Sequence, residues 1–310
     1  MRWTTYVSPT DGRQHPAVLS DGSLYGLRTA DRLIDLLGDD GELLARSGEQ
    51  ALADPLDVVA EADAQLLAPV PVPPSVRDFY AFETHVRTYR EANGKEMDPD
   101  WYELPVFYFQ NPAAVRSARD DVPMPPGSVK YDFELEFAAV VGRSGANLTP
   151  DEAEKHIAGY LLFCDWSARD LQAREVLHTL GPVKAKDTAT SLGPWLVTPD
   201  ELEPRRSRKS FDLEMSASVN GRPYSKGNAD DLYWSFGQMI SYASRGTRVQ
   251  TGDVIASGTV GTGCILELST VHGEDSYPWL KPGDEVRLEA DLLGSITARI
   301  TDAPPLHPLK

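Results

Sequence analysis

The feature that most constrains the fold of this chain is a strict alternation of residue type over positions 131–137, within an expected strand at 131–141. Apolar residues recur there at every second position, at Phe133, Leu135 and Phe137. This is the period of a β-strand and not that of a helix. The residues between them must then share the opposite face of the strand: Asp132, Glu134 and Glu136.

The acidic face of this strand is a candidate metal site. Glu134 and Glu136 lie two positions apart, which places their carboxylates about 7 Å from each other on one face. Two like charges that close raise each other's pKa unless a cation lies between them. A hard divalent cation fits, and Asp165, at the end of an apolar run at 160–164, can supply a third oxygen ligand. The alternative is a solvated face of an antiparallel sheet.

The rest of the pattern predicts a mixed, mainly β chain. Gly and Pro number 24 each, which favours turn-rich β structure over a helical bundle. Further strands are expected at 4–7, 17–19, 24–27, 160–164, 211–219, 254–257 and 286–290. Asn220-Gly221 is a strong hairpin signal after the fifth of these. Helices are expected at 32–37, 48–59, 150–158 and 228–246.

A proline-rich stretch indicates a division into two domains. Residues 66–75 read Leu-Leu-Ala-Pro-Val-Pro-Val-Pro-Pro-Ser, and repeated prolines exclude a helix and favour an extended connector. We therefore expect a small N-terminal α+β domain over residues 1–72 and a larger domain over 73–310.

Charge and cysteine content limit the partners. Lys+Arg number 30 and Asp+Glu 47, a net charge of −17, which argues against binding to nucleic acid or to an anionic membrane.

No apolar run reaches the ~18 residues of a spanning helix, and residues 1–9 lack the apolar core of a secretion signal, so we expect a cytoplasmic protein. The cysteines, Cys164 and Cys264, are too few for a disulfide framework and suit a reducing compartment.

Three other segments carry groups capable of chemistry. Asp78, Tyr80 and His85 follow the connector, and a neutral imidazole is the usual general base near pH 7; the alternative is an ordinary surface or hydrogen-bonded histidine. Residues 165–172 and 181–186 contain Arg169, Gln172 and Lys186, which can hold an anion, although salt bridges on a loop explain them as well.

The third segment is glycine-rich. Residues 257–263, Ser-Gly-Thr-Val-Gly-Thr-Gly, offer backbone N–H groups to an oxyanion but lack the lysine of a P-loop. A plain tight turn explains the same residues. Nearby, Glu267 alternates out of an apolar strand and by itself reads as an exposed carboxylate.

Together these segments resemble the fumarylacetoacetate hydrolase family over roughly residues 73–301. The segments that carry the resemblance occur in this order: Asp78-Phe-Tyr80 with His85 five residues on, Glu134-x-Glu136, Asp165-Trp-Ser-Ala-Arg169-Asp-Leu-Gln172, Gly181-Pro182 to Lys186, Asn220-Gly221, Gly252-Asp253-Val254-Ile255 to Gly258-Thr259, and Pro282-Gly283-Asp284. The resemblance implies a β-roll catalytic domain behind a small N-terminal SH3-like β domain, and a homodimer.

The resemblance also implies roles for individual residues. Glu134, Glu136 and Asp165, with Asp78 as a fourth, would ligate a divalent cation, Mg²⁺ before Ca²⁺ or Mn²⁺. His85 would activate water. Glu267, or else Glu83, would orient the imidazole of His85. Substrate oxygens would be held by Lys186, Gln172, Tyr80, Arg169 and Thr259. Gln110 stands where many members carry lysine, and Cys164 where asparagine is common.

The activity implied is metal-dependent hydrolysis of a C–C bond in a small anionic substrate, a 1,3-dicarbonyl or 2-oxo acid. The alternatives are decarboxylation of a 2-oxo diacid, isomerisation of a 2-hydroxydienoate, or a binding protein without catalysis. A histidine that activates water is needed only for hydrolysis, so His85 favours it.

Overall fold

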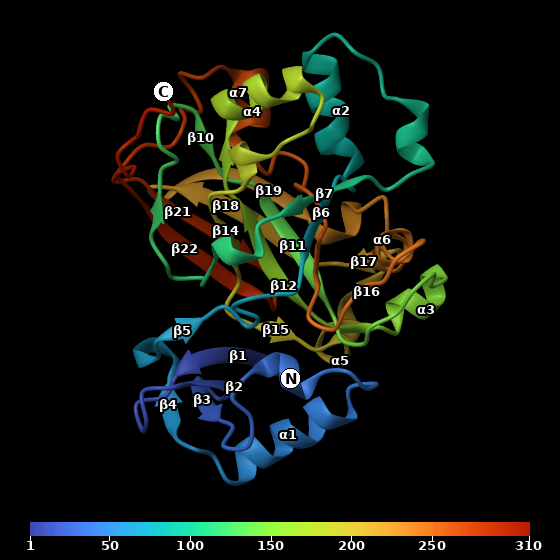
Figure 1. Cartoon of the computed structure of the whole chain (residues 1–310), viewed down its shortest axis with the longest axis vertical. Coiled ribbons are helices and arrows are strands. Elements are labelled where there is room, and N and C mark those ends of the chain that lie inside the picture. The colour runs from blue at the N-terminus through green and yellow to red at the C-terminus, as the bar shows by residue number, and fades with distance from the viewer.

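The computed structural model describes residues 1–310 (Figure 1). Its N-terminal lobe is an antiparallel meander of four strands: β1 (Arg2–Val7), β2 (Gln14–Ser20), β3 (Ser23–Gly26) and β4 (Val58–Ala60). Asp21 and Gly22 both have positive φ at the β2–β3 turn, which is the geometry that Asp-Gly supplies in tight hairpins. Helix α1 (Glu42–Ala53) packs against this meander.

The lobe is hydrogen-bonded to the rest of the molecule. Strand β1 pairs with β5 (Leu66–Leu67) and with β15 (Leu196–Val197), so the meander and the larger region share one sheet. Of the connector expected at 66–75, residues 66–67 form β5 and residues 68–75 form no helix or strand. The N-terminal β region is confirmed. The boundary between residues 72 and 73 stays a prediction.

The larger part of that sheet carries the centre of the molecule. Its strands are β6 (Val76–Phe79), β7 (Phe107–Gln110), β8 (Val115–Arg116), β11 (Leu135–Val141), β12 (Ile157–Asp165), β14 (Thr190–Leu192) and β20 (Val254–Ala256). In the middle the order is β12-β11-β20-β6-β7, with β20 and β6 parallel. Both β11 and β12 are buried on both faces, apart from Ala158, which is half-buried.

A second sheet lies against the first. It is made of β9 (Val122–Pro123), β18 (Glu214–Val219), β19 (Arg222–Asn228), β21 (Glu285–Ala290) and β22 (Gly294–Thr301). Two short pairs complete the β structure: β10 (Tyr131–Asp132) with β13 (Ser167–Ala168), and β16 (Arg206–Ser207) with β17 (Ser210–Phe211). The core includes aromatic contacts of Phe236 with Phe137 and Tyr160.

The helices are short. They are α2 (Glu83–Ala92), α3 (Pro150–Glu154), α4 (Arg169–Glu175), α5 (Pro199–Leu202), α6 (Phe236–Ala243) and α7 (Ile265–His272). Single 3₁₀ turns occur at Leu33–Leu36, Glu61–Asp63, Pro99–Tyr102, Pro112–Ala114, Val176–His178, Lys184–Lys186, Glu203–Arg205 and Ala229–Asp231. Helices α2, α4 and α7 gather at the end of the molecule opposite the N-terminal lobe (Figure 1). No helix is long and apolar enough to cross a membrane.

Several expected elements have other bounds. The helix expected at 48–59 is α1 instead, because Gly41 in left-handed conformation precedes it and Pro55 cannot continue it. The helix expected at 228–246 shortens to α6, since Ser235 and Gln238 form its capping box. The strand expected at 131–141 is broken between β10 and β11. The Asn220-Gly221 hairpin is confirmed between β18 and β19.

Candidate active site

Four carboxylates from three strands meet at one point of the central sheet. Asp78 lies on β6, Glu136 on β11 and Asp165 at the end of β12, and Glu134 directly precedes β11. Each offers an oxygen atom within 4.8 Å of the others. Strand β20 lies between β6 and β11, and its Ala256 pairs with Asp78 on one side and with Ala138 on the other, which fixes the register of these two strands.

These carboxylates are buried, so the alternative of a solvated sheet face is wrong. Asp78 is 1% exposed, Glu134 5%, and Glu136 and Asp165 0%. Burial, with the neighbouring carboxylates, raises the pKa of Glu136 well above its ordinary value. Burial likewise raises the pKa of Asp165 well above its usual range and that of Asp78 to about 6.

Two buried cations stabilise part of this charge. Lys186 donates from Nζ to Glu134 and Asp165, and Arg169 donates from Nη2 to Glu134 at 2.7 Å. Although burial opposes it, these cations lower the pKa of Glu134 well below its ordinary value. Arg169 also donates from Nε to Asp132 at 2.7 Å. Asp132 accepts in turn from the N–H groups of Ile265 and Leu266, at the start of α7.

The cluster fits a hard divalent cation. Oδ1 of Asp78 and Oδ1 of Asp165 are buried without a hydrogen-bond partner, and an unpaired buried carboxylate oxygen is costly. Oxygen ligands from several carboxylates are what Mg²⁺, Ca²⁺ and Mn²⁺ take in proteins. Asp78, Glu134, Glu136 and Asp165 therefore form a possible divalent metal site, and the metal's identity stays a prediction.

Strand β7 adds two side chains that the sequence reading did not place in the site. Tyr108 lies opposite Asp78 in the β6–β7 register and donates its hydroxyl at 2.8 Å to Oδ2 of Asp78. It also contacts Asp165. Gln110 donates from Nε2 to Asp78 at 2.9 Å and accepts from Thr190. The signal was available in Phe107-Tyr-Phe-Gln110, whose alternation puts both polar groups on one face.

His85 and Glu267 form a buried pair beside the carboxylates. Nδ1 of His85 lies 2.9 Å from Oε2 of Glu267. Glu83, the alternative partner, instead contacts Arg87 and Tyr102. The expected strand at Glu267 is wrong: this residue lies in the first turn of α7, which the thiol of Cys264 caps.

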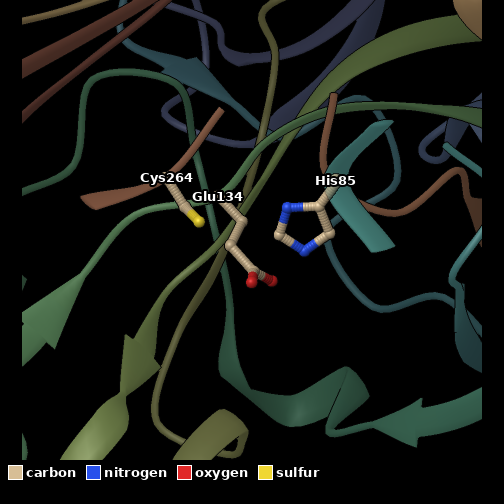
Figure 2. Close-up of side chains that lie close together, drawn as sticks. All are labelled: His85, Glu134 and Cys264. Atoms are coloured by element: carbon tan, nitrogen blue, oxygen red, sulfur yellow. The ribbon is translucent and has the colours of Figure 1, made fainter. Parts of the chain in front are cut away.

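Figure 2 shows His85 beside Glu134, one carboxylate of the acidic cluster. The imidazole of His85, the carboxylate of Glu134 and the thiol of Cys264 lie close together, with ligand atoms within 4.8 Å of one another. Tyr80 packs edge-on against the imidazole, with ring centroids 5.6 Å apart. Burial raises the pKa of Cys264 well above its ordinary value, so the neutral thiol is the expected form.

The glycine-rich segment holds a carboxylate of the protein itself. The N–H of Gly258 donates to Oε2 of Glu136 at 3.0 Å, and Oγ1 of Thr259 lies 3.4 Å from Oε1. Gly258 has φ +80, and a Cβ there would lie 2.4 Å from the carbonyl oxygen of Phe79. Only glycine fits at this position.

Gly258→Ala is therefore expected to lower stability by about 1–3 kcal/mol and to weaken binding of Mg²⁺ by displacing Glu136. Thermal unfolding and calorimetric titration measure the two effects. Gly273→Ala is the matched control, because Gly273 has φ +90 but open space around its Cβ position. If stability and Mg²⁺ affinity fell equally in both variants, the contact with Phe79 would have no role.

Most of the chain matches one known protein family. Residues 75–301 match the family described as Fumarylacetoacetate (FAA) hydrolase C-terminal. The chain belongs to the fumarylacetoacetate hydrolase family. The resemblance and the mainly β fold expected from the motifs are confirmed.

Individual relatives in this family differ in activity. Fumarylacetoacetase of Oryza sativa subsp. japonica is 29% identical over 290 residues, covering 75% of this chain and 67% of the relative. Human mitochondrial oxaloacetate tautomerase FAHD2A is also 29% identical, over 262 residues, covering 84% of this chain and 77% of the relative.

Solved structures share the fold over nearly the whole chain. Fumarylacetoacetate hydrolase from Exiguobacterium antarcticum has a TM-score of 0.76 at 24% identity, covering 97% of this chain and 99% of its own. Maleylpyruvate hydrolase from Sphingobium sp. SYK-6, in complex with manganese(II) and pyruvate, has a TM-score of 0.71 at 22% identity, covering 98% and 100%.

This protein has an open cleft of about 440 Å³ beside the carboxylate cluster. It is lined by all of the residues expected to bind substrate: Tyr80, Arg169, Gln172, Lys186 and Thr259. Arg169 and Gln172 are hydrogen-bonded to each other at 3.0 Å. Their roles toward a substrate stay predictions.

Proposed function

We propose that this protein is a divalent-metal-dependent hydrolase that cleaves a C–C bond in a 1,3-dicarbonyl or 2-oxo acid. The observation that carries the proposal is the buried pair of His85 and Glu267 beside a cluster of four carboxylates; His85 and three of those carboxylates, Asp78, Glu134 and Glu136, line one cleft. A base beside a divalent cation site is the arrangement that hydrolysis of a C–C bond next to a carbonyl needs. The structure of maleylpyruvate hydrolase from Sphingobium sp. SYK-6, which contains manganese(II) and pyruvate, is consistent with such a substrate.

The protein's own side chains supply the proton transfers. With Nδ1 directed at Glu267, Nε2 of His85 can take a proton from water as the water oxygen adds to the distal carbonyl. The C–C bond then breaks, its electron pair stays on the carbon next to the 2-oxo group, and that carbon is protonated to complete the second product. Mg²⁺, held by Asp78, Glu134, Glu136 and Asp165, would supply a Lewis acid for the 1,2-dicarbonyl end of the substrate. Lys186 and Gln172 would stabilise developing negative charge on oxygen.

The direct test is turnover of acylpyruvates and of fumarylacetoacetate by protein loaded with Mg²⁺, then with Mn²⁺ or Ca²⁺, and then with a chelator. We expect acylpyruvates to give a carboxylic acid and a 2-oxo acid in equal amounts, fumarylacetoacetate to give fumarate and acetoacetate in equal amounts, and the chelator to stop both reactions. Oxaloacetate, assayed alongside, separates hydrolysis from tautomerisation or decarboxylation. A metal-loaded protein that cleaves none of the dicarbonyl acids would overturn the proposal.

Glu267 is proposed as a positioning residue that orients His85. Glu267→Ala is expected to lower kcat about 100-fold and to change KM little, because Glu267 contacts the base and not the substrate. Steady-state kinetics measure this split, and Glu267→Asp is expected to restore part of kcat. A variant whose KM rises while kcat stays constant would contradict this role.

We also propose a cytoplasmic homodimer, consistent with the reducing conditions that Cys164 and Cys264 suit. Light scattering coupled to size-exclusion chromatography measures the mass in solution. A mass of one chain, 34.1 kDa, at micromolar concentration would contradict the dimer.

A further inference from the structure

The cleft above the carboxylates has two chemically different ends. Its floor is polar and contains His85, Lys186 and three carboxylates of the acidic cluster, those of Asp78, Glu134 and Glu136. Its outer wall is apolar and is made of Tyr89, Val106, Phe107, Val176, Leu180 and Leu266. These residues come from α2, from β7 and the segment before it, from the segment after α4, and from α7. Helices α2, α4 and α7 gather at one end of the molecule (Figure 1).

The outer wall is exposed in the free protein. Leu180 is 79% exposed, Val176 48% and Val106 46%. Exposed apolar residues that are continuous with a polar site are what a ligand with an apolar part would cover. The volume of the cleft, about 440 Å³, lies in the range of small-molecule sites.

None of the basic groups that line the cleft is free to pair with a carboxylate at this outer wall. The basic groups that line the cleft are His85, Arg169 and Lys186. Each is bonded to a carboxylate of the protein: Glu267 for His85, Asp132 and Glu134 for Arg169, and Glu134 and Asp165 for Lys186. A second carboxylate on the substrate would lose water there without gaining a cation, which is costly.

We propose that the outer wall binds an uncharged, apolar acyl arm, so that the site binds 2-oxo and 2,4-dioxo monocarboxylates in preference to dicarboxylates, and the 2,4-dioxo acids are the ones it cleaves. Val106 and Leu180 are the specificity-determining residues. This inference rests on the proposed function, because it assumes that the 2-oxo acid end lies at the metal site. Each methylene of the arm that moves from water onto the wall is expected to tighten binding about fourfold.

The test uses two acids with the same eight carbons, 2-oxooctanoate and 2-oxooctanedioate. They differ only at the distal end, a methyl group against a carboxylate, and neither has the 1,3-dicarbonyl bond that the proposed reaction cleaves. Calorimetric titration of Mg²⁺-loaded protein is expected to show the monoacid binding on the order of 100-fold more tightly. Equal affinities, or no binding of either acid, overturn the inference.

A variant pair locates the preference on the wall. Leu180→Arg adds a cation at the distal end, and we expect it to reduce the preference to less than about fivefold or to reverse it. Leu177→Arg is the matched control, because Leu177 lies in the same segment, is also 79% exposed, and does not line the cleft. If both variants change the ratio equally, the effect is one of net charge and the assignment of Leu180 is wrong.

Failure of this inference and failure of the proposed function are distinguishable. The affinity ratio of the two 2-oxo acids is read without turnover. Hydrolysis is measured separately with 2,4-dioxooctanoate, for which the expected products are pyruvate and pentanoate. Hydrolysis with equal affinities rejects only the apolar arm, and a 100-fold ratio without hydrolysis rejects only the reaction.

Discussion

His85→Ala is expected to lower kcat/KM for the proposed hydrolysis about 1,000-fold and to leave the affinity for Mg²⁺ within about twofold of wild type. Loss of a general base typically costs a factor of this size. Metal affinity is spared because His85 is bonded to Glu267 and is not one of the four clustered carboxylates. Initial rates at acylpyruvate concentrations well below KM and calorimetric titration with Mg²⁺ measure the two quantities.

His272→Ala is the matched control for this prediction. His272 ends α7, the helix that carries Glu267, and it is exposed and outside the cleft. Its removal is expected to change neither quantity. A wild-type rate in His85→Ala would remove His85 from the mechanism, and a parallel loss of Mg²⁺ affinity would make it a metal ligand instead of a base.

The carboxylate cluster shows how far local pattern predicts a site. The alternation at 131–137 placed Glu134 and Glu136 together, and the structure does bring them together. The same alternation left a solvated face open, and this was wrong. Whether a strand face meets water depends on β6, β7 and the segments after β12, which come from distant parts of the chain and cover the cluster. Period alone carries no information about those long-range contacts.

Glu267 shows the opposite case, in which the partner was predicted and the local structure was not. Leu266-Glu267-Leu268 alternates as a strand would, yet it forms the first turn of a helix. The carboxylate of Asp132, from a strand far away in the sequence, accepts from the N–H groups of Ile265 and Leu266 and satisfies the start of that helix. A capping group supplied by another strand leaves no signal in the local sequence.

Tyr108 was missed for a related reason. A tyrosine in an apolar strand is ordinarily a core residue, and nothing near it in the sequence is acidic. Its hydroxyl meets Asp78 and Asp165 only because β7 pairs with β6. The register between two strands, and not the composition of either one, makes it part of the site.

The net charge of −17 is distributed in a way that matters for function. Bulk charge argues against polyanionic partners, but it does not set the sign of a pocket. Here Lys186 and Arg169 are buried beside the acidic cluster. With a divalent cation added, the floor of the cleft becomes suited to a small anion despite the acidic surface.

Glu136→Gln is expected to have effects of opposite sign on metal affinity and on the stability of the metal-free protein. Affinity for Mg²⁺ is expected to fall by at least about 100-fold, since even groups that only orient ligands cost 10- to 100-fold. The metal-free variant is expected to melt at a higher temperature than metal-free wild type. Glu136 is fully buried among Asp78, Glu134 and Asp165, and the neutral amide removes a charge that burial and these neighbours disfavour.

The variant keeps the local contacts of the side chain. The amide oxygen of glutamine can still accept from the N–H of Gly258, which donates to Oε2 of Glu136 at 3.0 Å. The two effects are therefore attributable to charge. Calorimetric titration and thermal unfolding, each with and without Mg²⁺, measure them, and the rise in Tm that Mg²⁺ gives to wild type should be absent from the variant.

Glu103→Gln is the matched control, because it makes the same chemical change at an exposed position outside the cleft. Neither affinity nor Tm is expected to change in it. Wild-type affinity in Glu136→Gln would remove Glu136 from the set of metal ligands. A metal-free variant that melts below wild type would show that the crowded carboxylates do not destabilise the protein, and the argument from their burial to a bound cation would then lose its physical basis.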